Sequence, residues 1–468
     1  MNKIYLTFWI TALFFAPLLV QATHIYSGYI SYTTDPQNPL KFDFVFTLYT
    51  KAASSADDPF VSISMGDGKV QTVERARITP YSHRYDKEIF TWSHTYAAPG
   101  NYTVHWTGEN RNGGIINMAA PSDLITLKIV TLVKAGTATQ NLHGAKLAGV
   151  PVTAAYTGEP WTHNFLAYDE DGDYLKYDLV TPKHRSSSFE IADVPGYWPP
   201  EGLTVSDFGE IHWPNPVQKG EYVIALKVTE MRDGREIGHM IVDMTFLVTE
   251  RADQPKMSLL NKNRLTVNSD GSIQTWPGQP VKLEFYLKKN PTSDLPLSAR
   301  PFGEIDTLKL VNTSLAFRDT ADGFAITYSF TPGPDMERTE PYLMGMRGRP
   351  VEEFTGDRLP YGKVEDAWAF AYIYVGEQRR PLSSGDDFPT ERPKLYPNPA
   401  RSEFTIEAPD LPALHLLMRD VTGKVVASYT LRPGRNDFAR PAKLASGLYT
   451  YTLTSQLSPI ETGKLMLQ

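Results

Sequence analysis

The sequence predicts an all-β protein built from several β-sandwiches in tandem. The chain has 468 residues, which is enough for roughly three domains at about 150 residues each. Aromatic residues make up 12% of it, and it contains 33 glycines and 36 prolines, a composition typical of strands joined by many turns. With 41% hydrophobic and 21% charged residues, the chain has enough apolar material for packed cores.

The N-terminus has the pattern of a cleaved secretory signal peptide. A short cationic start precedes an apolar run over 4–20, and the small residue Ala22 follows Val20 in an A-x-A-like site. The alternative is an uncleaved anchor, because the run could nearly span a bilayer. Pro17 and the cleavage site favour removal of residues 1–22, so we expect no integral membrane segment in the mature chain.

Residues 23–133 are predicted to form the first β-sandwich. Apolar side chains alternate from Phe42 to Leu48, so one face of this strand is expected to be buried. Aromatic residues recur over 90–96 and over 102–106, and the Pro-Gly pair between these runs reverses the chain. An aromatic hairpin of this kind packs at the edge of a sandwich.

Two patterns in this segment resemble known surface modules. The Gly-Asp-Gly turn at 66–68 and the string from His94 to Val104 resemble a PKD-type immunoglobulin-like domain. Residues 22–25, together with 111–117, resemble the N-terminal region of large surface proteins from gliding bacteria. These resemblances imply a fold, and they imply no particular activity.

Residues 134–252 are predicted to form a second sandwich. An Asp-Glu-Asp-Gly-Asp loop at 169–173 precedes a Leu-x-Tyr strand at 175–177 and a Gly-x-Ile-x-Trp strand at 209–213. A turn at 232–234 then leads to a closing apolar strand. This order resembles the cadherin-like and immunoglobulin-like modules of bacterial surface proteins, which implies a second immunoglobulin-like β-sandwich.

Asp169, Asp171 and Asp173 are candidate ligands for Ca²⁺. Three carboxylates at alternate positions around a glycine can wrap a hard cation that prefers oxygen. The twelfth position counted from Asp169 is Val180, so the bidentate glutamate of an EF-hand is absent. The alternative is a polar turn in which the aspartates accept backbone N–H groups.

Residues 253–376 are predicted to form a third β-rich domain. Strand patterns occur at 281–287, 324–330 and 367–375. The following stretch, 377–394, is rich in Arg, Ser, Asp and Pro and is predicted to be an exposed linker where the chain is processed.

Residues 395–468 are predicted to form a small antiparallel sandwich. Tyr449, Tyr451 and Leu453 alternate with threonines and share one face of a half-buried strand. A Thr-Gly pair at 422–423 is a hairpin turn signal.

This C-terminal segment closely resembles the sorting domain of the bacterial type IX secretion system. The residues that carry the resemblance are Tyr396, Pro397, Asn398, Pro399, Gly447, Tyr449, Tyr451, Gly463 and Lys464. The resemblance implies passage through the periplasm, recognition by the type IX secretion machinery, and delivery to the outer cell surface or the medium, with removal of the domain. The alternative is a last adhesive β-module that stays attached.

Composition and motif searches exclude several classes of function. The chain has no cysteine, which excludes a disulfide scaffold, a thiol nucleophile and a thiolate zinc site. Its net charge of −7 argues against nucleic acid as a partner. Neither an H-E-x-x-H zinc helix nor a G-x-S-x-G elbow occurs.

Four tryptophans are candidate platforms for sugar rings: Trp92, Trp106, Trp198 and Trp213. The alternative for each is burial in a sandwich core. Together these features predict a non-catalytic modular protein that binds an extracellular glycan or protein or acts in adhesion. The alternative function is that of a secreted hydrolase or its accessory subunit, acting on polysaccharide or protein.

Overall fold

The computed structural model describes most of the chain strand by strand. The described residues are 25–52, 58–81, 85–136, 140–150, 154–250, 255–289, 296–350, 366–377, 394–408, 414–420, 424–440, 444–455 and 458–468. The predicted signal peptide (1–22) lies outside them, as does most of the predicted linker (377–394). The chain divides into two compact units, Met1–Gln378 and Arg379–Gln468.

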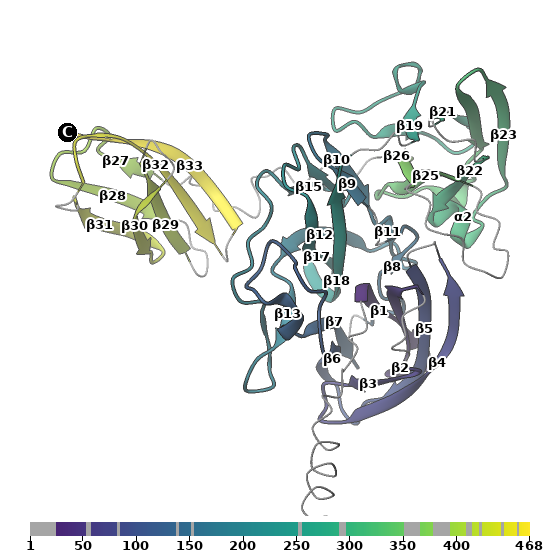
Figure 1. Ribbon diagram of the computed structural model, residues 1–468, viewed down its shortest axis with the longest axis horizontal. Helices are drawn as coiled ribbons and strands as arrows, with labels where there is room; N and C mark the ends of the chain where they lie inside the picture. Colours follow the sequence, from purple (N-terminus) through teal and green to yellow (C-terminus); the bar gives the residue numbers. More distant parts are fainter. Residues whose placement is uncertain are drawn as a thin grey trace, which may run out of the picture. The chain divides into compact units, whose positions relative to one another are not determined.

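β-strands form nearly all of the regular structure of the described residues (Figure 1). The helices found there are short: α2 (Glu304–Leu308) and the 3-10 turns η2 (Ser122–Leu124), η3 (Lys262–Arg264) and η4 (Pro334–Met336). The prediction of an all-β chain is therefore confirmed.

The first two predicted sandwiches share one sheet of thirteen strands. The N-terminal strands are β1 (Ile25–Asp35), β2 (Asn38–Lys51), β3 (Phe60–Ser64), β4 (Val70–Pro80), β5 (Tyr85–Thr95), β6 (Gly100–Gly108) and β7 (Leu127–Ala135). Those that follow are β8 (Lys146–Leu147), β9 (Ala154–Tyr156), β10 (Trp161–Asn164), β11 (Ala167–Tyr168), β12 (Tyr174–Val180), β13 (Lys183–Arg185), β14 (Ile191–Asp193), β15 (Thr204–Val205), β16 (Glu210–Trp213), β17 (Gly220–Arg232) and β18 (Arg235–Thr249). Five of these strands lie outside the large sheet: β10, β16 and β15 form a three-stranded sheet, and β8 pairs with β11. β1 pairs with β18, with Ser27 opposite Met244, and β7 pairs with β6, β13 and β18. The two modules are thus joined by backbone hydrogen bonds, while the boundary at 133/134 stays a prediction.

Strand β1 can join the two modules because it is buried on both faces. Ile30 and Tyr32 pack in the core of the N-terminal strands, whereas Tyr29 packs in a second core with Trp161 and Phe246. The strand's sequence, Ile-Tyr-Ser-Gly-Tyr-Ile-Ser-Tyr, lacks the alternation of a half-exposed strand. Such an unbroken pattern is typical of a strand covered on both sides.

The alternation from Phe42 to Leu48 predicts the N-terminal core correctly. Phe42, Phe44, Phe46 and Leu48 are each at most 4% exposed and belong to one hydrophobic cluster. The Pro-Gly pair also turns the chain as expected, since β6 begins at Gly100.

The third segment is a sandwich of two four-stranded sheets, ordered β19-β21-β24-β23 and β20-β26-β25-β22. Its strands are β19 (Lys256–Leu259), β20 (Ile273–Thr275), β21 (Val281–Lys288), β22 (Leu297–Gly303), β23 (Thr313–Thr320), β24 (Gly323–Phe330), β25 (Tyr342–Pro350) and β26 (Ala367–Val375). One cluster that includes Phe285, Tyr328 and Ile373 fills the space between the sheets.

This third sandwich packs against the strands that precede it. Leu166 and Phe208 form a small core with Tyr372. Arg347, only 2% exposed, lies with its guanidinium 4.6 Å from the ring centre of Phe302 and donates a hydrogen bond to the hydroxyl of Tyr81. A buried arginine needs such partners, so this contact fixes the third sandwich in place.

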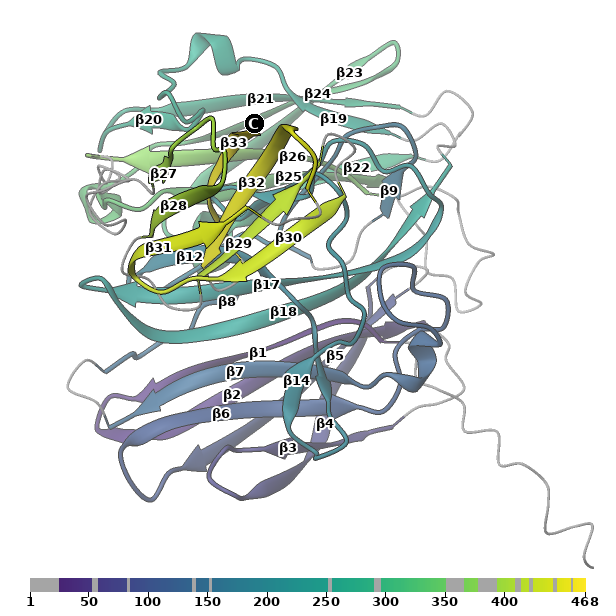
Figure 2. The same cartoon turned by 90° about the vertical axis from the view of Figure 1, so that its left-hand side faces the viewer.

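The C-terminal unit is a smaller sandwich of one three-stranded and one four-stranded sheet, ordered β27-β28-β31 and β30-β29-β32-β33 (Figure 2). Its strands are β27 (Lys394–Tyr396), β28 (Glu403–Ala408), β29 (Leu414–Arg419), β30 (Val425–Thr430), β31 (Gly434–Ala439), β32 (Gly447–Ser455) and β33 (Ser458–Leu467). Tyr449 and Leu453 are buried in its core, and Tyr451 packs against that core, as their alternation predicts.

Candidate functional site

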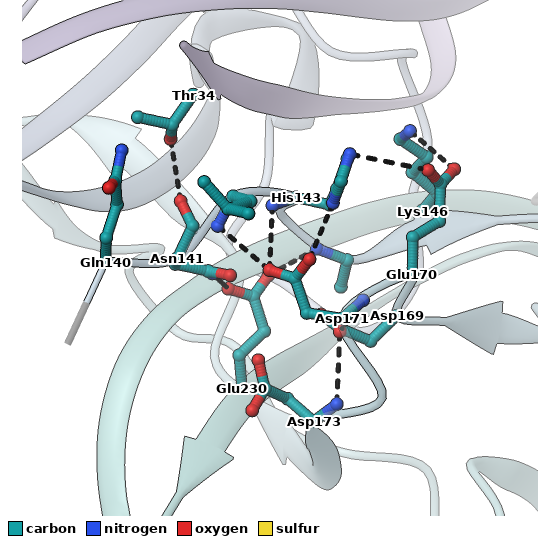
Figure 3. A network of polar contacts seen from close by, with 12 residues as sticks. Thr34, Gln140, Asn141, His143, Lys146, Asp169, Glu170, Asp171, Asp173 and Glu230 are labelled. Atoms are coloured by element: carbon teal, nitrogen blue, oxygen red, sulfur yellow. Dashed lines mark hydrogen bonds and ion pairs between the residues drawn. The ribbon is translucent and has the colours of Figure 1, made fainter. Parts of the chain in front are cut away.

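The three predicted aspartates meet in the turn between β11 and β12 (Figure 3). Asp169, Asp171 and Asp173 each place a carboxylate oxygen so that all three atoms lie within 4.8 Å of one another. Asp169 is 4% exposed and Asp173 is 9% exposed. The cluster is therefore a donor set of oxygens that could hold a metal ion.

The backbone of the turn explains why an aspartate stands at position 169. Oδ1 of Asp169 accepts the backbone N–H groups of Asp171 at 2.9 Å and Asp173 at 3.1 Å. Gly172 has a φ of +77°, which a side chain would strain. Asp169 thus uses one oxygen in the polar turn that the alternative interpretation predicts.

The other two aspartates bind neighbouring elements. Oδ2 of Asp171 accepts the backbone N–H groups of Leu142 and His143, and its Oδ1 lies 2.6 Å from Nδ1 of His143. The guanidinium of Arg232 donates two hydrogen bonds to Asp173, from Nε to Oδ1 at 2.7 Å and from Nη2 to Oδ2 at 2.6 Å. These two carboxylates hold the turn against the 140–143 segment and the end of β17.

A fourth carboxylate, Glu230 on β17, lies deeper and is 1% exposed. It accepts hydrogen bonds from the Ala145 N–H, from Nδ2 of Asn141 and, at 3.3 Å, from the hydroxyl of Tyr32. Burial raises its pKa to about 8. Burial likewise raises the pKa of Asp169 to about 7, and the charges of its two neighbouring aspartates add to this.

Two buried oxygens in this network have no hydrogen-bond partner among the described residues: Oδ2 of Asp169 and Oδ1 of Asn141. Buried polar atoms are nearly always partnered, so such atoms indicate a missing proton, water or ion. Among the described residues, the basic partners of the four carboxylates in this network are the guanidinium of Arg232 and the imidazole of His143. Oδ2 of Asp169 is the free donor atom that a bound cation would use. Sequence reasoning missed Asn141, Glu230 and Arg232, because each lies far from the loop in the chain.

Several of the sorting-motif residues lie against the closing strand β33. Nδ2 of Asn398 donates to the Lys464 carbonyl at 2.6 Å, and its Oδ1 accepts the N–H of Met466 at 2.9 Å. Gly463 lies opposite Tyr451, and a Cβ at this glycine would come within 2.5 Å of the tyrosine ring. The Tyr-Pro-Asn-Pro opening is thus fastened to the closing strand β33.

The four candidate tryptophans have different environments. Trp106 and Trp213 are buried, at 8% and 4% exposed, and Trp92 stacks on Phe44 with the ring centres 5.1 Å apart. Trp198 is 45% exposed. Trp198 is the most exposed of the four, since Trp92 is half-buried.

The loop that carries Trp198 is fixed by a fully buried asparagine. Nδ2 of Asn117 donates to the carbonyls of Trp198 at 3.2 Å and Val223 at 2.8 Å, and its Oδ1 accepts the N–H of Val223 at 2.9 Å. The Trp198 N–H donates in turn to the Asn117 carbonyl. Nothing in the local sequence of Asn117 predicts this role.

Residues 394–468 match the family described as a secretion system C-terminal sorting domain. The C-terminal unit carries a type IX sorting domain. This domain implies interaction with the secretion machinery, and it directs the protein to the outer cell surface or the medium, as predicted. Among the described residues, no helix has the length and apolar character needed to cross a membrane.

The solved structures that align with this chain do so at low sequence identity. None of the curated proteins matches this chain. Solved structures that align with it include Sidekick-1 immunoglobulin domains 1–5 (10% identity, 95% of this chain, 99% of that chain, TM-score 0.16). Zebrafish RET cadherin-like domains 1 to 4 align over 96% of this chain and 97% of that chain (9% identity, TM-score 0.17). The S-layer protein rSbsC(31-844) aligns over 98% of this chain and 68% of that chain (12% identity, TM-score 0.15). At TM-scores this low, the alignments carry no argument about function.

Proposed function

We propose that the exported chain is a non-catalytic modular protein that binds an extracellular glycan, with Trp198 as a contact for a sugar ring. The observation that carries this proposal is an exposed indole on a loop fixed by Asn117. Aromatic faces offer a flat apolar surface to the C–H groups of a sugar. A fixed loop loses little conformational entropy on binding, which favours affinity. In this proposal residues 23–133 are a PKD-like module and residues 134–252 a cadherin-like one.

One hollow in the third segment, among the described residues, offers no general acid or base to a hydrolase. A hollow of about 440 Å³ opens at the ends of β23 and β24. Its lining residues are Pro280, Val311, Asn312, Thr313, Ser314, Ser329, Phe330 and Thr331. None is a histidine or an acid, and hydrolysis ordinarily needs such a group as general acid or base.

Binding of the mature protein to immobilised laminarin, xylan, pullulan and peptidoglycan tests this function. We expect saturable binding to one of these glycans without release of soluble products. Trp198→Ala should weaken that binding about tenfold, because the stacked ring and its apolar contact are lost. Trp276→Ala is the matched control, since Trp276 is 43% exposed on the third segment. If Trp198→Ala binds as tightly as Trp276→Ala, Trp198 is not a contact for the glycan. Steady release of sugar or peptide would favour the alternative function, a secreted hydrolase.

We further propose that the metal held by Asp169, Asp171 and Asp173 is Ca²⁺. All donors in the cluster are oxygens, which Ca²⁺ prefers, and Oδ2 of Asp169 is a buried donor with no partner among the described residues. The guanidinium of Arg232 already neutralises Asp173, so we expect binding to be weak.

The melting temperature of the mature protein in EDTA and in excess Ca²⁺ tests this assignment. A ligand at about 100 times its dissociation constant stabilises the folded state by about 2.7 kcal/mol. We expect Ca²⁺ to raise the melting temperature of the wild type and to leave that of Asp169→Asn unchanged. Asp270→Asn, in the third segment, is the control. If neither EDTA nor Ca²⁺ changes the melting temperature of the wild type, the cluster does not bind calcium.

A further inference from the structure

Three adjacent strands, β6, β7 and β13, carry a row of polar side chains on the face turned away from the N-terminal core. Thr107 and Lys183 both lie directly opposite Lys128 in their antiparallel ladders. Opposite residues of such a pair point to the same face of the sheet, and so do residues two positions along each strand. His105 and Arg185 therefore share this face, while the odd-numbered neighbours of Lys128 pack in the core.

Lys128 differs from the other cations of this row. It is 2% exposed, and it has no hydrogen bond or ion pair among the described residues. Lys183 is paired with Asp193, and both Nη atoms of Arg185 bind Glu109, at 3.1 Å and 2.8 Å. Nζ of Lys128 is not one of the fully buried unpartnered atoms of the described residues, so the stem of this lysine is buried while its ammonium reaches the surface without an acid partner.

The charged group that acts most directly on Lys128 is the guanidinium of Arg185. Burial and the guanidinium of Arg185 lower the pKa of Lys128. Burial and the charge of Lys128 lower the pKa of His105 in the same way. Among the described residues, Arg185 pairs with the carboxylate of Glu109, whose side chain is 69% exposed, and ion pairs at such exposed positions are weak. A competing anion could therefore replace Glu109 at low cost.

We propose that Lys128, together with Arg185, binds an anionic oxygen group, the carboxylate or sulfate of an acidic polysaccharide. Arg185 presents a planar fork that suits two oxygens of such a group, and Lys128 supplies a point charge beside it. The hydroxyl of Thr107 on the adjacent strand provides a further donor on this face. The site is independent of Trp198, so either can fail without the other.

Calorimetric titration of the mature protein with dextran sulfate, polygalacturonate and sodium sulfate at low ionic strength tests the site. We expect one of the polymers to bind and its affinity to fall as NaCl is added, because exposed ion pairs are screened by salt. Lys128→Met should weaken binding about tenfold or more, since a charge-assisted contact is lost. Lys282→Met removes the same charge from an exposed position on β21 and should bind like the wild type.

Methionine can fill the space of the buried Lys128 stem, so Lys128→Met should keep the melting temperature of the wild type, which checks that the variant folds. Arg185→Gln gives a second test if that variant does not fold, and it should also bind at least several-fold more weakly. Sulfate binding that is lost in Lys128→Met would support the site and show that a free anion suffices as occupant. Wild-type affinity in both variants, or no binding of any probe to the wild type, would overturn the proposal.

Discussion

Two buried titratable side chains of the second segment, Glu230 and His163, have opposite environments. Glu230 accepts hydrogen bonds from Ala145, Asn141 and Tyr32. His163 is 1% exposed and lies among the rings of Trp161, Phe165 and Phe370. Burial raises the pKa of the first to about 8 and lowers that of the second to about 4.

The difference shows that burial favours the neutral form of either group, so the two residues limit stability at opposite ends of the pH scale. Folded Glu230 keeps its proton to higher pH than the unfolded chain does. Its contribution to stability is therefore present below the unfolded pKa and is lost as pH rises. Folded His163 gives up its proton more readily, so its contribution is present near neutrality and is lost as pH falls.

The largest expected effect is that of Glu230→Gln. In the wild type, the free energy of unfolding should fall by about 4 kcal/mol between the unfolded pKa of 4.5 and the folded pKa of about 8. The glutamine cannot ionise, so its curve should lack this loss. We expect the variant to be less stable than the wild type at pH 5, where an N–H donor loses its acceptor, and more stable at pH 9. Urea denaturation across this range, in EDTA, measures both curves, and parallel curves would contradict the environment assigned to Glu230.

The next effect is that of His163→Phe. The wild type should lose about 3 kcal/mol as pH falls from the unfolded pKa of 6.5 to the folded pKa of about 4. Phenylalanine fits the same aromatic surroundings and carries no proton, so the acid limb of its stability curve should flatten. Denaturation between pH 4 and pH 7 measures this, with His212→Phe as control for a half-buried histidine on β16. If His163→Phe loses as much stability in acid as the wild type does, another titratable group causes the acid limb of the curve.

The smallest effect is that of Tyr32→Phe. The Tyr32 hydroxyl lowers the pKa of Glu230 by donating a hydrogen bond at 3.3 Å. Its loss should move the alkaline limb of the stability curve to slightly higher pH, with a change of about 1 kcal/mol or less. An unchanged alkaline limb in Tyr32→Phe, measured beside Glu230→Gln, would show that this long contact contributes nothing.

Local patterns in the sequence predicted local structure well. The alternation from Phe42 to Leu48 predicts a buried strand face, and the spacing of Asp169, Asp171 and Asp173 predicts a turn that gathers carboxylates. In the Tyr-Pro-Asn-Pro motif, Asn398 is the residue that fastens the opening to β33. In the first two cases the residues that cooperate lie close together or follow a fixed period, whereas Asn398 was found through the family resemblance, since its partners on β33 are distant in the chain.

Contacts between distant residues could not be predicted in this way. Glu230 follows a strongly apolar stretch of β17. From the local sequence alone, a buried glutamate at this position looks the same as one at an exposed strand end. The pairing of Ser27 with Met244 joins residues from two predicted modules, and periodicity carries no information about strand partners so far apart. Asn117 and Lys128 were missed for the same reason, because their roles depend on loops and strands elsewhere in the chain.

The pairing of β1 with β18 has a consequence for how the chain matures. The ribosome makes β1 first, but the strand that completes its hydrogen bonding ends only at Thr249. Until β18 has been made, one edge of β1 has no strand partner, and unpaired strand edges associate readily with other chains. A nascent chain halted before this point would hold an unfinished sheet, so truncation there should yield aggregates and not a stable N-terminal fragment.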